Sequence, residues 1–367
     1  MKEKVFYLLS VFLVTVTTYL ILGIWGLFEI KNNDILLFKN KIDLDFHKKY
    51  SNKVHHLRDV NKWGKKENEY LFSEISFNEK FSKSILLQGD SWIEDISNIS
   101  TSEKFVKSYG QNNEYNIYNA GITSFAPSVM HAQYKILKND FKISPQILVI
   151  YIDQTDIGDE NCRYKHNKVY SSDGKFLNVQ REKYTRATYD YSKLYMYSEL
   201  NFDSNLIKIF KFPYLKINYF LKRNFNILKQ IKIKGYSNRN ISKCGFYEIM
   251  KNLIEHNSQS ETNFKQSLIE YINFLSKEDK IKKIFLVSFP HINHHKNIYK
   301  VNVSNYIDNV LVNIKDDRIN HINLNKLDFS KTKIEKIYRK NDIGSHLNDQ
   351  NHIDLFLKNI FSEIKNY

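Results

Sequence analysis

Cysteine is scarce in this sequence, which has two among its 367 residues, Cys162 and Cys244. They are compatible with one disulfide outside the cytoplasm or with two free thiols. Zinc-finger, helix-turn-helix and RNA-binding signatures are also absent. The net charge of +15 comes mostly from lysines scattered through an asparagine- and isoleucine-rich sequence, with no concentrated basic patch. We therefore expect no nucleic-acid partner, and the charge fits anionic lipid or glycan surfaces equally well.

Charge is missing altogether from Val5–Phe28, near the amino terminus. As a helix this segment would be about 36 Å long, enough to cross a bilayer core of roughly 30 Å. A cleaved signal peptide has a shorter apolar region and a small-x-small cleavage site, whereas this run ends in bulky side chains. Lysines precede the run, so we predict an uncleaved single-pass anchor with the amino terminus in the cytoplasm and the remaining chain extracytoplasmic. A buried core helix is the alternative.

Ser84–Glu94 joins a short apolar run to a tight turn and a polar, helix-compatible segment. Ile85–Leu87 is the apolar run and Gly89–Ser91 the turn, which together predict a buried strand followed by a helix. Ser91 then lies at the carboxyl end of a strand, where open α/β sheets bind ligands. There its hydroxyl can be exposed and its backbone N–H free near a helix start. The alternative is that Ser91 only caps the helix.

Apolar runs and helical patterns alternate along the rest of the chain. Helical spacing connects the runs, as in Ser128–Leu137 and Phe264–Leu275, and Asp173-Gly174 between extended flanks predicts a hairpin. Continuous apolar runs are typical of buried parallel strands, so we predict an α/β fold, a three-layer sandwich of flavodoxin-like type with a mainly parallel sheet. The predicted strands are Ile85–Leu87, Tyr115–Asn119, Ile147–Ile152, Lys283–Phe289 and Arg318–Leu324.

The same pattern divides the chain into three segments. Residues 5–28 are the predicted transmembrane anchor, residues 29–83 a stalk and lead-in, and residues 84–367 the main folded domain. Within that domain, residues at about 183–260 alternate apolar side chains with lysines and predict a helical insertion. This insertion is either a lid or side layer on the core, or a contact with the membrane surface.

Polar groups follow several of the predicted strands. They are Ser91, Gly121, the Asp153–Asp156 cluster and, near the carboxyl terminus, Asp342 and His346. In a parallel sheet such strand ends converge on one edge. Acyl transfer through serine needs a hydroxyl, a base, an acid that orients the base, and donors for the oxyanion. Ser91, His346 and Asp342 are the candidates for the first three roles, and the backbone amides of Ser91 and Gly121 for the fourth.

In order and placement, these motifs resemble those of the SGNH/GDSL hydrolases. Gly89-Asp90-Ser91 is similar to the first block of that family, whose serine is the nucleophile, and Asn119-Ala120-Gly121 is similar to the second. The third block, usually Gly-x-Asn-Asp, reads Asp153-Gln154-Thr155-Asp156 here. An aspartate and a histidine before a final helix correspond to the last block. The resemblance covers most of residues 84–367 outside the insertion and implies a cofactor-independent serine hydrolase domain.

One departure from the family concerns the oxyanion donors. Thr155 stands where the family has an asparagine, and a threonine hydroxyl donates one hydrogen bond with a shorter reach than an amide. We expect Thr155 to join Ser91 and Gly121 as a donor, with Gln154 as a possible substitute. Loss of one such donor lowers the rate by about 10²–10³-fold in a known hydrolase.

A second departure concerns the base and its acid. The family spaces them Asp-x-x-His, whereas Asp342 lies four residues before His346. Asp349 and His352 keep the family spacing and are the alternative acid and base. We favour His346 because its position directly before the terminal helix resembles that of the catalytic histidine in the family.

The leading prediction is a membrane-anchored serine esterase that hydrolyses acyl groups, acetyl first, on an envelope glycan or lipid. One alternative is an O-acetyltransferase that acts on envelope polysaccharide, and another is a non-catalytic binding protein of the same fold. We expect no cofactor, because water completes the hydrolysis. We also expect no metal, since His291, His294 and His295 lack an acid or cysteine at a recognisable ligand spacing.

Overall fold

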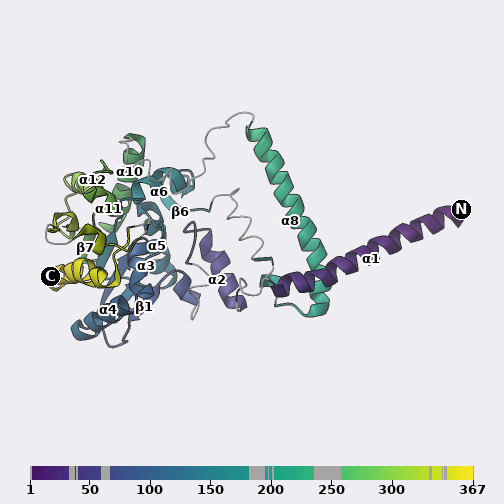
Figure 1. The fold of residues 1–367 in the computed structure, drawn as a ribbon, viewed down its shortest axis with the longest axis horizontal. Helices are drawn as coiled ribbons and strands as arrows, with labels where there is room; N and C mark the ends of the chain where they lie inside the picture. The colour runs from purple at the N-terminus through teal and green to yellow at the C-terminus, as the bar shows by residue number, and fades with distance from the viewer. Residues whose placement is uncertain are drawn as a thin grey trace. The chain divides into compact units, whose positions relative to one another are not determined.

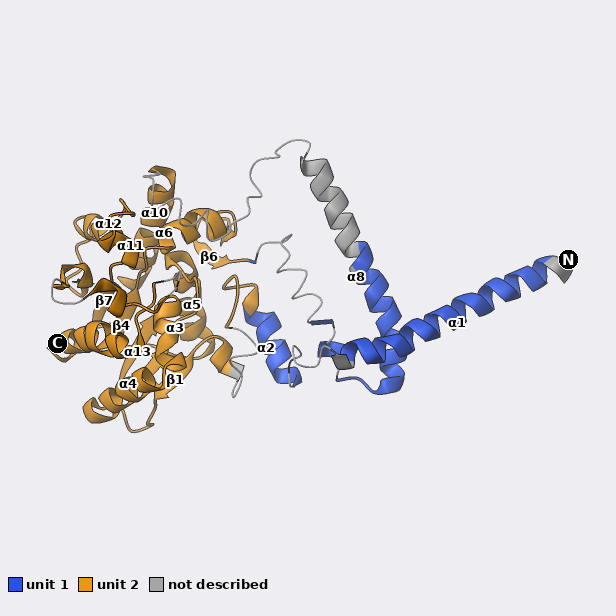
Figure 2. Cartoon of the chain, in the orientation of Figure 1, with its two compact units in different colours: residues 1–50, 59–67, 181–242 blue, residues 51–58, 68–180, 243–367 orange. Residues whose placement is uncertain are grey.

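The chain forms two compact units, shown in different colours in Figure 2. Unit 1 consists of residues 1–50, 59–67 and 181–242, and unit 2 of residues 51–58, 68–180 and 243–367. The computed structural model describes residues 2–32, 38, 40–58, 67–181, 195–196, 198–200, 202–234, 258–329, 333–340, 342 and 345–366.

Unit 2 is built on a six-stranded sheet (Figure 1). All neighbouring strands in it are parallel except β1 and β3, which pair antiparallel at one edge. Every residue of β4 is buried, as expected for a central parallel strand with an unbroken apolar sequence. In spatial order the strands are β1 (Ser73–Ser76), β3 (Tyr115–Asn119), β2 (Lys83–Gln88), β4 (Ile147–Tyr151), β7 (Lys283–Ser288) and β8 (Ile319–Asn323).

Helices pack on both faces of this sheet. On one face α3 (Ser91–Asn98), α4 (Ser100–Asn113) and α14 (Lys358–Lys365) share a hydrophobic core with alternate strand residues. Gln88 of β2 faces the other side, where its Nε2 donates to Gln133 Oε1 of α5 (Pro127–Asp140) at 2.7 Å. Tyr271 of α10 (Ser258–Leu275) donates to the side-chain oxygen of Gln88 on that side. The α/β class with a mainly parallel sheet is therefore confirmed.

The strands predicted from apolar runs are present at nearly the expected bounds. The predicted hairpin corresponds to β5 (Lys168–Tyr170) and β6 (Phe176–Val179), which pair antiparallel, and Gly174 at its turn has the left-handed φ of 76°. The sequence did not predict β1, which lies in the segment expected to be a stalk and lead-in. Residues 68–83 of that segment therefore belong to unit 2.

Unit 1 contains the apolar helix at the amino terminus. This helix, α1 (Lys2–Asn32), includes Lys4–Ile30, which is long and apolar enough to cross a membrane by length and composition. Helix α8 (Asn205–Lys234) lies within the predicted helical insertion and packs against α1 (Figure 2). Residues 235–257, also in that insertion, lie outside the described residues.

Gly121, just after β3, packs against the backbone of α3. A Cβ at this position would lie 2.3 Å from Glu94 N and 2.5 Å from Ile93 C. We expect Gly121→Ala to lower the free energy of unfolding by roughly 1–3 kcal/mol, because backbone on both sides must separate. Urea unfolding followed by circular dichroism measures this. As a control, Gly174→Asn, with nothing within 4 Å of its Cβ, should cost less than about 1 kcal/mol; equal losses would contradict the packing argument.

Candidate active site

Ser91 is the first residue of α3 and follows the turn that ends β2. The Asp90 carboxylate accepts a hydrogen bond from Trp92 N at 3.0 Å and so caps the helix. Gly89 lets this turn lie against α3, since a Cβ there would come within 2.6 Å of Ile93 Cγ1. Because Asp90 is the N-cap, the Ser91 hydroxyl is left for a different contact.

The side chains of Ser91, His346 and Asp342 lie in one hydrogen-bonded chain. His346 Nε2 is 2.7 Å from Ser91 Oγ, and His346 Nδ1 is 2.6 Å from Asp342 Oδ2. A carboxylate only accepts, so Nδ1 carries the proton and Nε2 of the neutral ring accepts from the Ser91 hydroxyl. The His346 and Asp342 side chains are 17% and 20% exposed, so the group borders solvent.

The loop that carries His346 is fixed by bonds with no local signal in the sequence. Arg339 N donates to the His346 carbonyl at 2.8 Å. Ser345, in the left-handed conformation with φ 55°, has its Oγ 2.7 Å from His291 Nε2. His291 Nδ1 accepts from Asn293 N, so in the neutral ring Nε2 bears the proton and donates to Ser345. His291 is therefore a group that positions the His346 loop.

Nearby acids set the protonation of His346. Burial lowers the pKa of His346, but its hydrogen bond to Asp342 and the negative charges of Asp95, Asp342 and Asp90 outweigh burial and raise the pKa above 6.5. Asp95 was not among the predicted site residues, and its Oδ2 lies 2.9 Å from a guanidinium nitrogen of Arg339. Below its pKa, protonated His346 cannot accept a proton from Ser91, so a base role requires higher pH.

The alternative pair, Asp349 and His352, is not brought to Ser91. His352 is buried, with Nδ1 2.8 Å from Ser102 Oγ and Nε2 3.1 Å from the Trp92 carbonyl. Burial lowers the pKa of His352 to about 4. Both ring nitrogens are thus engaged between α3 and α4, and His352 serves packing there.

The predicted oxyanion donors are engaged to different degrees. Gly121 N donates to Asn119 Oδ1 at 2.9 Å. Thr155 donates both its amide and its hydroxyl to Asp153 Oδ2, at 3.1 and 2.5 Å. The Ser91 amide has no hydrogen-bond partner among the described residues. Of the three predicted donors, Ser91 is therefore the one with an open N–H.

Gln154, the possible substitute donor, is fully buried. Its Oε1 accepts from Val303 N at 2.9 Å. Its Nε2 finds no hydrogen-bond partner within the part of the chain that the structure describes. Gln154 therefore holds the start of α12 (Val303–Leu311) and keeps an unused donor inside the protein.

The turn after β3 is clamped to α3 by polar contacts that the sequence did not reveal. Asn119 Nδ2 donates to the Ile93 carbonyl at 2.9 Å, and Glu94 Oε2 accepts from Thr123 N at 2.7 Å. Arg58 is buried and donates to the Gly121 carbonyl from Nε at 3.0 Å and from a terminal nitrogen at 2.8 Å. Burial lowers the pKa of Arg58 to about 10, so the guanidinium is charged at neutral pH. These contacts hold Gly121 beside the amino-terminal half of α3.

Buried acids surround the base of the site. Burial first, and then repulsion from neighbouring carboxylates, raise the pKa of Asp90 and of Asp156 well above 3.8. Burial likewise raises the pKa of Asp159 to about 7, against the lowering effect of Arg163. Asp156 Oδ2 accepts from Asp153 N at 3.2 Å. Asp156 thus fixes the loop after β4 through its contact with Asp153.

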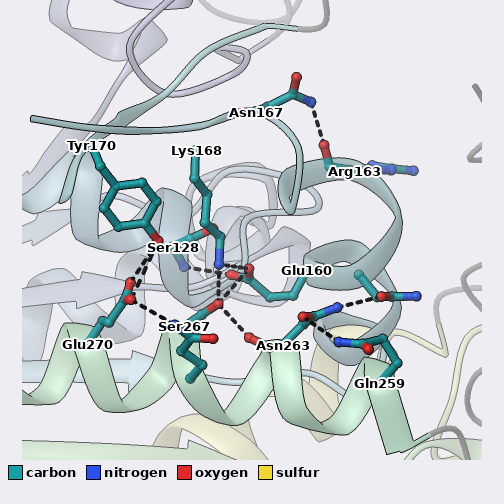
Figure 3. A network of polar contacts seen from close by, with 12 residues as sticks. Ser128, Glu160, Arg163, Asn167, Lys168, Tyr170, Gln259, Asn263, Ser267 and Glu270 are labelled. Carbon is teal, nitrogen blue, oxygen red and sulfur yellow. Dashed lines mark hydrogen bonds and ion pairs between the residues drawn. The ribbon is translucent and has the colours of Figure 1, made fainter. Parts of the chain in front are cut away.

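Glu160, next along this loop, ties four elements together (Figure 3). Its Oε1 accepts from Ser128 N, at the start of α5, at 2.6 Å. Its Oε2 accepts from Ser267 Oγ of α10 at 2.8 Å and lies 3.1 Å from Lys168 Nζ of β5. Glu160 itself lies in a π-helical turn, η3 (Glu160–Tyr164), so this buried carboxylate fixes the loop against both helices and the hairpin.

The histidines after β7 have structural partners. His294 Nε2 lies 2.7 Å from the Val301 carbonyl, and His295 Nε2 lies 3.1 Å from the Tyr338 hydroxyl. Among the described residues no cluster of three or more histidine, cysteine or acidic side chains could hold a metal ion.

No protein-family model matches the sequence, and no curated protein matches it. The solved structures that resemble the chain include the following three. A family two carbohydrate esterase from Clostridium thermocellum, in complex with cellohexaose, has TM-score 0.36 and 10% identity over 79% of this chain and 66% of that chain. An alpha/beta hydrolase enzyme from the metagenome of Lake Arreo has TM-score 0.37 and 7% identity, over 77% and 94%. An acetyl xylan esterase from the rumen bacterium Butyrivibrio proteoclasticus has TM-score 0.36 and 9% identity, over 79% and 64%.

This chain thus spans just under two thirds of the length of both carbohydrate esterases. At these TM-scores the likeness is slight. The function proposed below therefore rests on the chain's own residues and their geometry.

The assignment of Asp342 as the partner of His346 can be tested by NMR titration. We expect the His346 ring to titrate with a midpoint above 6.5 and Asp342→Asn to lower that midpoint, because the variant removes the charge that stabilises the imidazolium. Asp349→Asn is the matched control and should leave the midpoint unchanged. A shift in Asp349→Asn with none in Asp342→Asn would contradict the assignment.

Proposed function

We propose that this protein is a serine esterase of the SGNH type. The proposal depends on one observation: His346 Nε2 lies 2.7 Å from Ser91 Oγ, while Nδ1 of the same ring contacts Asp342. Nucleophile, base and orienting acid are each within hydrogen-bond reach of the next, which is the arrangement that activates a serine. The serine comes from a chain region far from the other two residues, so local structure alone does not account for their meeting.

In the proposed reaction Ser91 Oγ attacks the ester carbonyl while His346 Nε2 takes its proton. His346 then donates that proton to the leaving alcohol, and an acyl-serine forms. Water, deprotonated by His346, attacks the acyl-serine; the acyl–Oγ bond breaks, His346 returns the proton to Ser91 Oγ, and the acid is released. Asp342 holds the ring in the tautomer with the proton on Nδ1 and stabilises the imidazolium that forms.

The Ser91 amide is the oxyanion donor best supported by the structure, since its N–H is open at the start of α3, where the helix dipole also favours negative charge. Gly121 and Thr155, the other donors predicted from the sequence, donate to Asn119 and Asp153. Gly121 and Thr155 would stabilise the oxyanion only by releasing or sharing those hydrogen bonds.

For the substrate we propose acyl esters, acetyl first, on a glycan or lipid of the cell envelope. The partly exposed His346 and Asp342 side chains suit access by a large substrate. Helix α1 would hold the enzyme at a membrane with unit 2 on the extracytoplasmic side. Cys162, which is disulfide-bonded, supports an oxidising compartment; the other cysteine, Cys244, lies outside the described residues.

An O-acetyltransferase is the second candidate, because it shares formation of the acyl-serine and differs only in the acceptor. Product analysis with a glycan acceptor present separates the two: transfer to a sugar hydroxyl indicates the transferase, and release of free acid indicates the esterase. A non-catalytic binding protein would form no acyl-enzyme at all.

The role of Ser91 is tested with p-nitrophenyl acetate and the full-length protein. We expect Ser91→Ala to lower the rate of hydrolysis by about 10³-fold or more, because the nucleophile is gone. Ser362→Ala, on the exposed side of α14, is the matched control and should keep the parent rate. Equal rates for Ser91→Ala and the parent would remove Ser91 from the mechanism.

The role of Thr155 is tested by Thr155→Val, with Thr155→Ser, which keeps the hydroxyl, as the control. Because the hydroxyl is bonded to Asp153, we expect Thr155→Val to lower kcat by less than about tenfold. A loss of roughly 10²–10³-fold in Thr155→Val but not in Thr155→Ser would show that Thr155 turns to the oxyanion during the reaction.

A further inference from the structure

Helix α1 has one buried face, which lies in its carboxyl-terminal half. Gly23, Gly26 and Ile30 are buried there and Tyr19 is half-buried, at the spacing of one side of a helix. A Cβ on Gly23 would lie 2.2 Å from the carbonyl oxygen of Ile209 in α8. Gly23 therefore lets the α8 backbone come close, as in contacts between membrane helices, and Gly26 makes room for the Phe212 ring.

One backbone carbonyl of α8 at this contact lacks its usual helical hydrogen bond. Pro213 lies inside α8 and has no N–H, so the helical hydrogen bond to the Ile209 carbonyl cannot form. That carbonyl is the one that faces Gly23. The next carbonyl, of Phe210, accepts from the Tyr19 hydroxyl of α1 at 2.5 Å. In a bilayer such groups must be satisfied within the protein, and α1 lies against both of them.

Side chains complete the contact near the end of the apolar run. Phe212 of α8 packs edge-on against Trp25, with ring centroids 6.3 Å apart. Lys216 Nζ lies 2.6 Å from Glu29 and 5.4 Å from the Trp25 ring centroid. Tryptophan and lysine beside the end of an apolar helix are typical of the membrane–water boundary.

The surface of α8 that α1 leaves uncovered has two distinct sides. One side is apolar and exposed, and its residues recur at helical spacing. Lys208 lies on the other side, and Lys211 borders the apolar side. An exposed apolar stripe flanked by lysines is the pattern of a helix that lies in the surface of an anionic membrane. Among the residues of α8 whose side chains the structure describes, the exposed large apolar ones are Leu206, Ile207, Phe210, Tyr214, Ile217, Phe220 and Leu221.

We propose that the first half of α8, residues 205–221, lies in the membrane–water interface beside α1, with its exposed apolar side in the acyl region and its lysines toward anionic headgroups. The occupant is a lipid surface because the apolar side of α8 continues from a helix that is itself long and apolar enough to span a bilayer. This inference rests on the proposal that α1 is a retained anchor. It also explains why α1 has a face shaped for α8, which a cleaved signal peptide would not need.

The test uses full-length protein in vesicles of equal parts phosphatidylcholine and phosphatidylglycerol, with or without brominated acyl chains. Bromine quenches tryptophan that enters the acyl region. We expect the emission added by Tyr214→Trp to lose most of its intensity in brominated vesicles. Lys208→Trp, on the other side of the same helix, is the matched control and should lose little. Equal quenching of the two, or quenching of neither, overturns the proposal.

The contact with α1 is tested in the Tyr214→Trp protein by adding Gly26→Leu, since a side chain there would meet the Phe212 ring within 2.3 Å. We expect quenching of the tryptophan introduced in α8 to fall several-fold, while Ile24→Leu, on the exposed side of α1, leaves it unchanged. Unchanged quenching in Gly26→Leu would overturn the role of α1.

Two further readouts distinguish failure of the α8 proposal from failure of the α1 anchor and from dimer formation. Quenching of a tryptophan introduced by Phe12→Trp, in the middle of the apolar run, reports insertion of α1. Quenching there without quenching of the tryptophan introduced in α8 rejects the α8 proposal alone and leaves the anchor standing. An introduced tryptophan that stays unquenched, together with a dimer cross-linked through α8, would assign this face to a second copy of the chain and also overturn the proposal. None of these results depends on the chemistry of Ser91.

Discussion

The geometry of the site depends on how closely α3 lies against the turn after β3. Gly121 permits backbone contact with Glu94, and Asn119 donates to the Ile93 carbonyl across the same contact. Ser91 is the first residue of α3, so whatever fixes the helix also fixes the hydroxyl. Misplacement of a reacting group by about 1 Å can cost roughly 10²-fold in rate. Arg58 is buried and donates to the Gly121 carbonyl, which holds the same turn in place.

Much of unit 2 could be predicted from the sequence because its strands are continuous apolar runs bounded by turns. β4 is the clearest case, with every side chain buried. Parallel strands bring their carboxyl ends to one edge, and this rule places Ser91, directly after β2, at that edge. His346 follows no strand of the sheet, since β8 ends at Asn323, and the bonds of its own loop bring it to Ser91. The edge strand β1 escaped prediction because it is short, polar in part, and paired on one side only.

The finer parts of the site could not be predicted because they depend on long-range pairing. The contact of Ser345 with His291 and that of Arg58 with Gly121 join residues with no sequence signal in common. The availability of the oxyanion donors could not be predicted from the sequence either. A motif names Thr155 as a donor, but only the structure shows that Asp153 accepts both of its hydrogen bonds.

The most direct measurement is the rate at which a fluorophosphonate labels the full-length protein, with the adduct located by mass spectrometry. Activation of Ser91 by His346 predicts one adduct, on Ser91, and labelling that is roughly 10³-fold slower in His346→Gln. Labelling of His346→Gln at the parent rate, or an adduct on a different residue, would contradict the account.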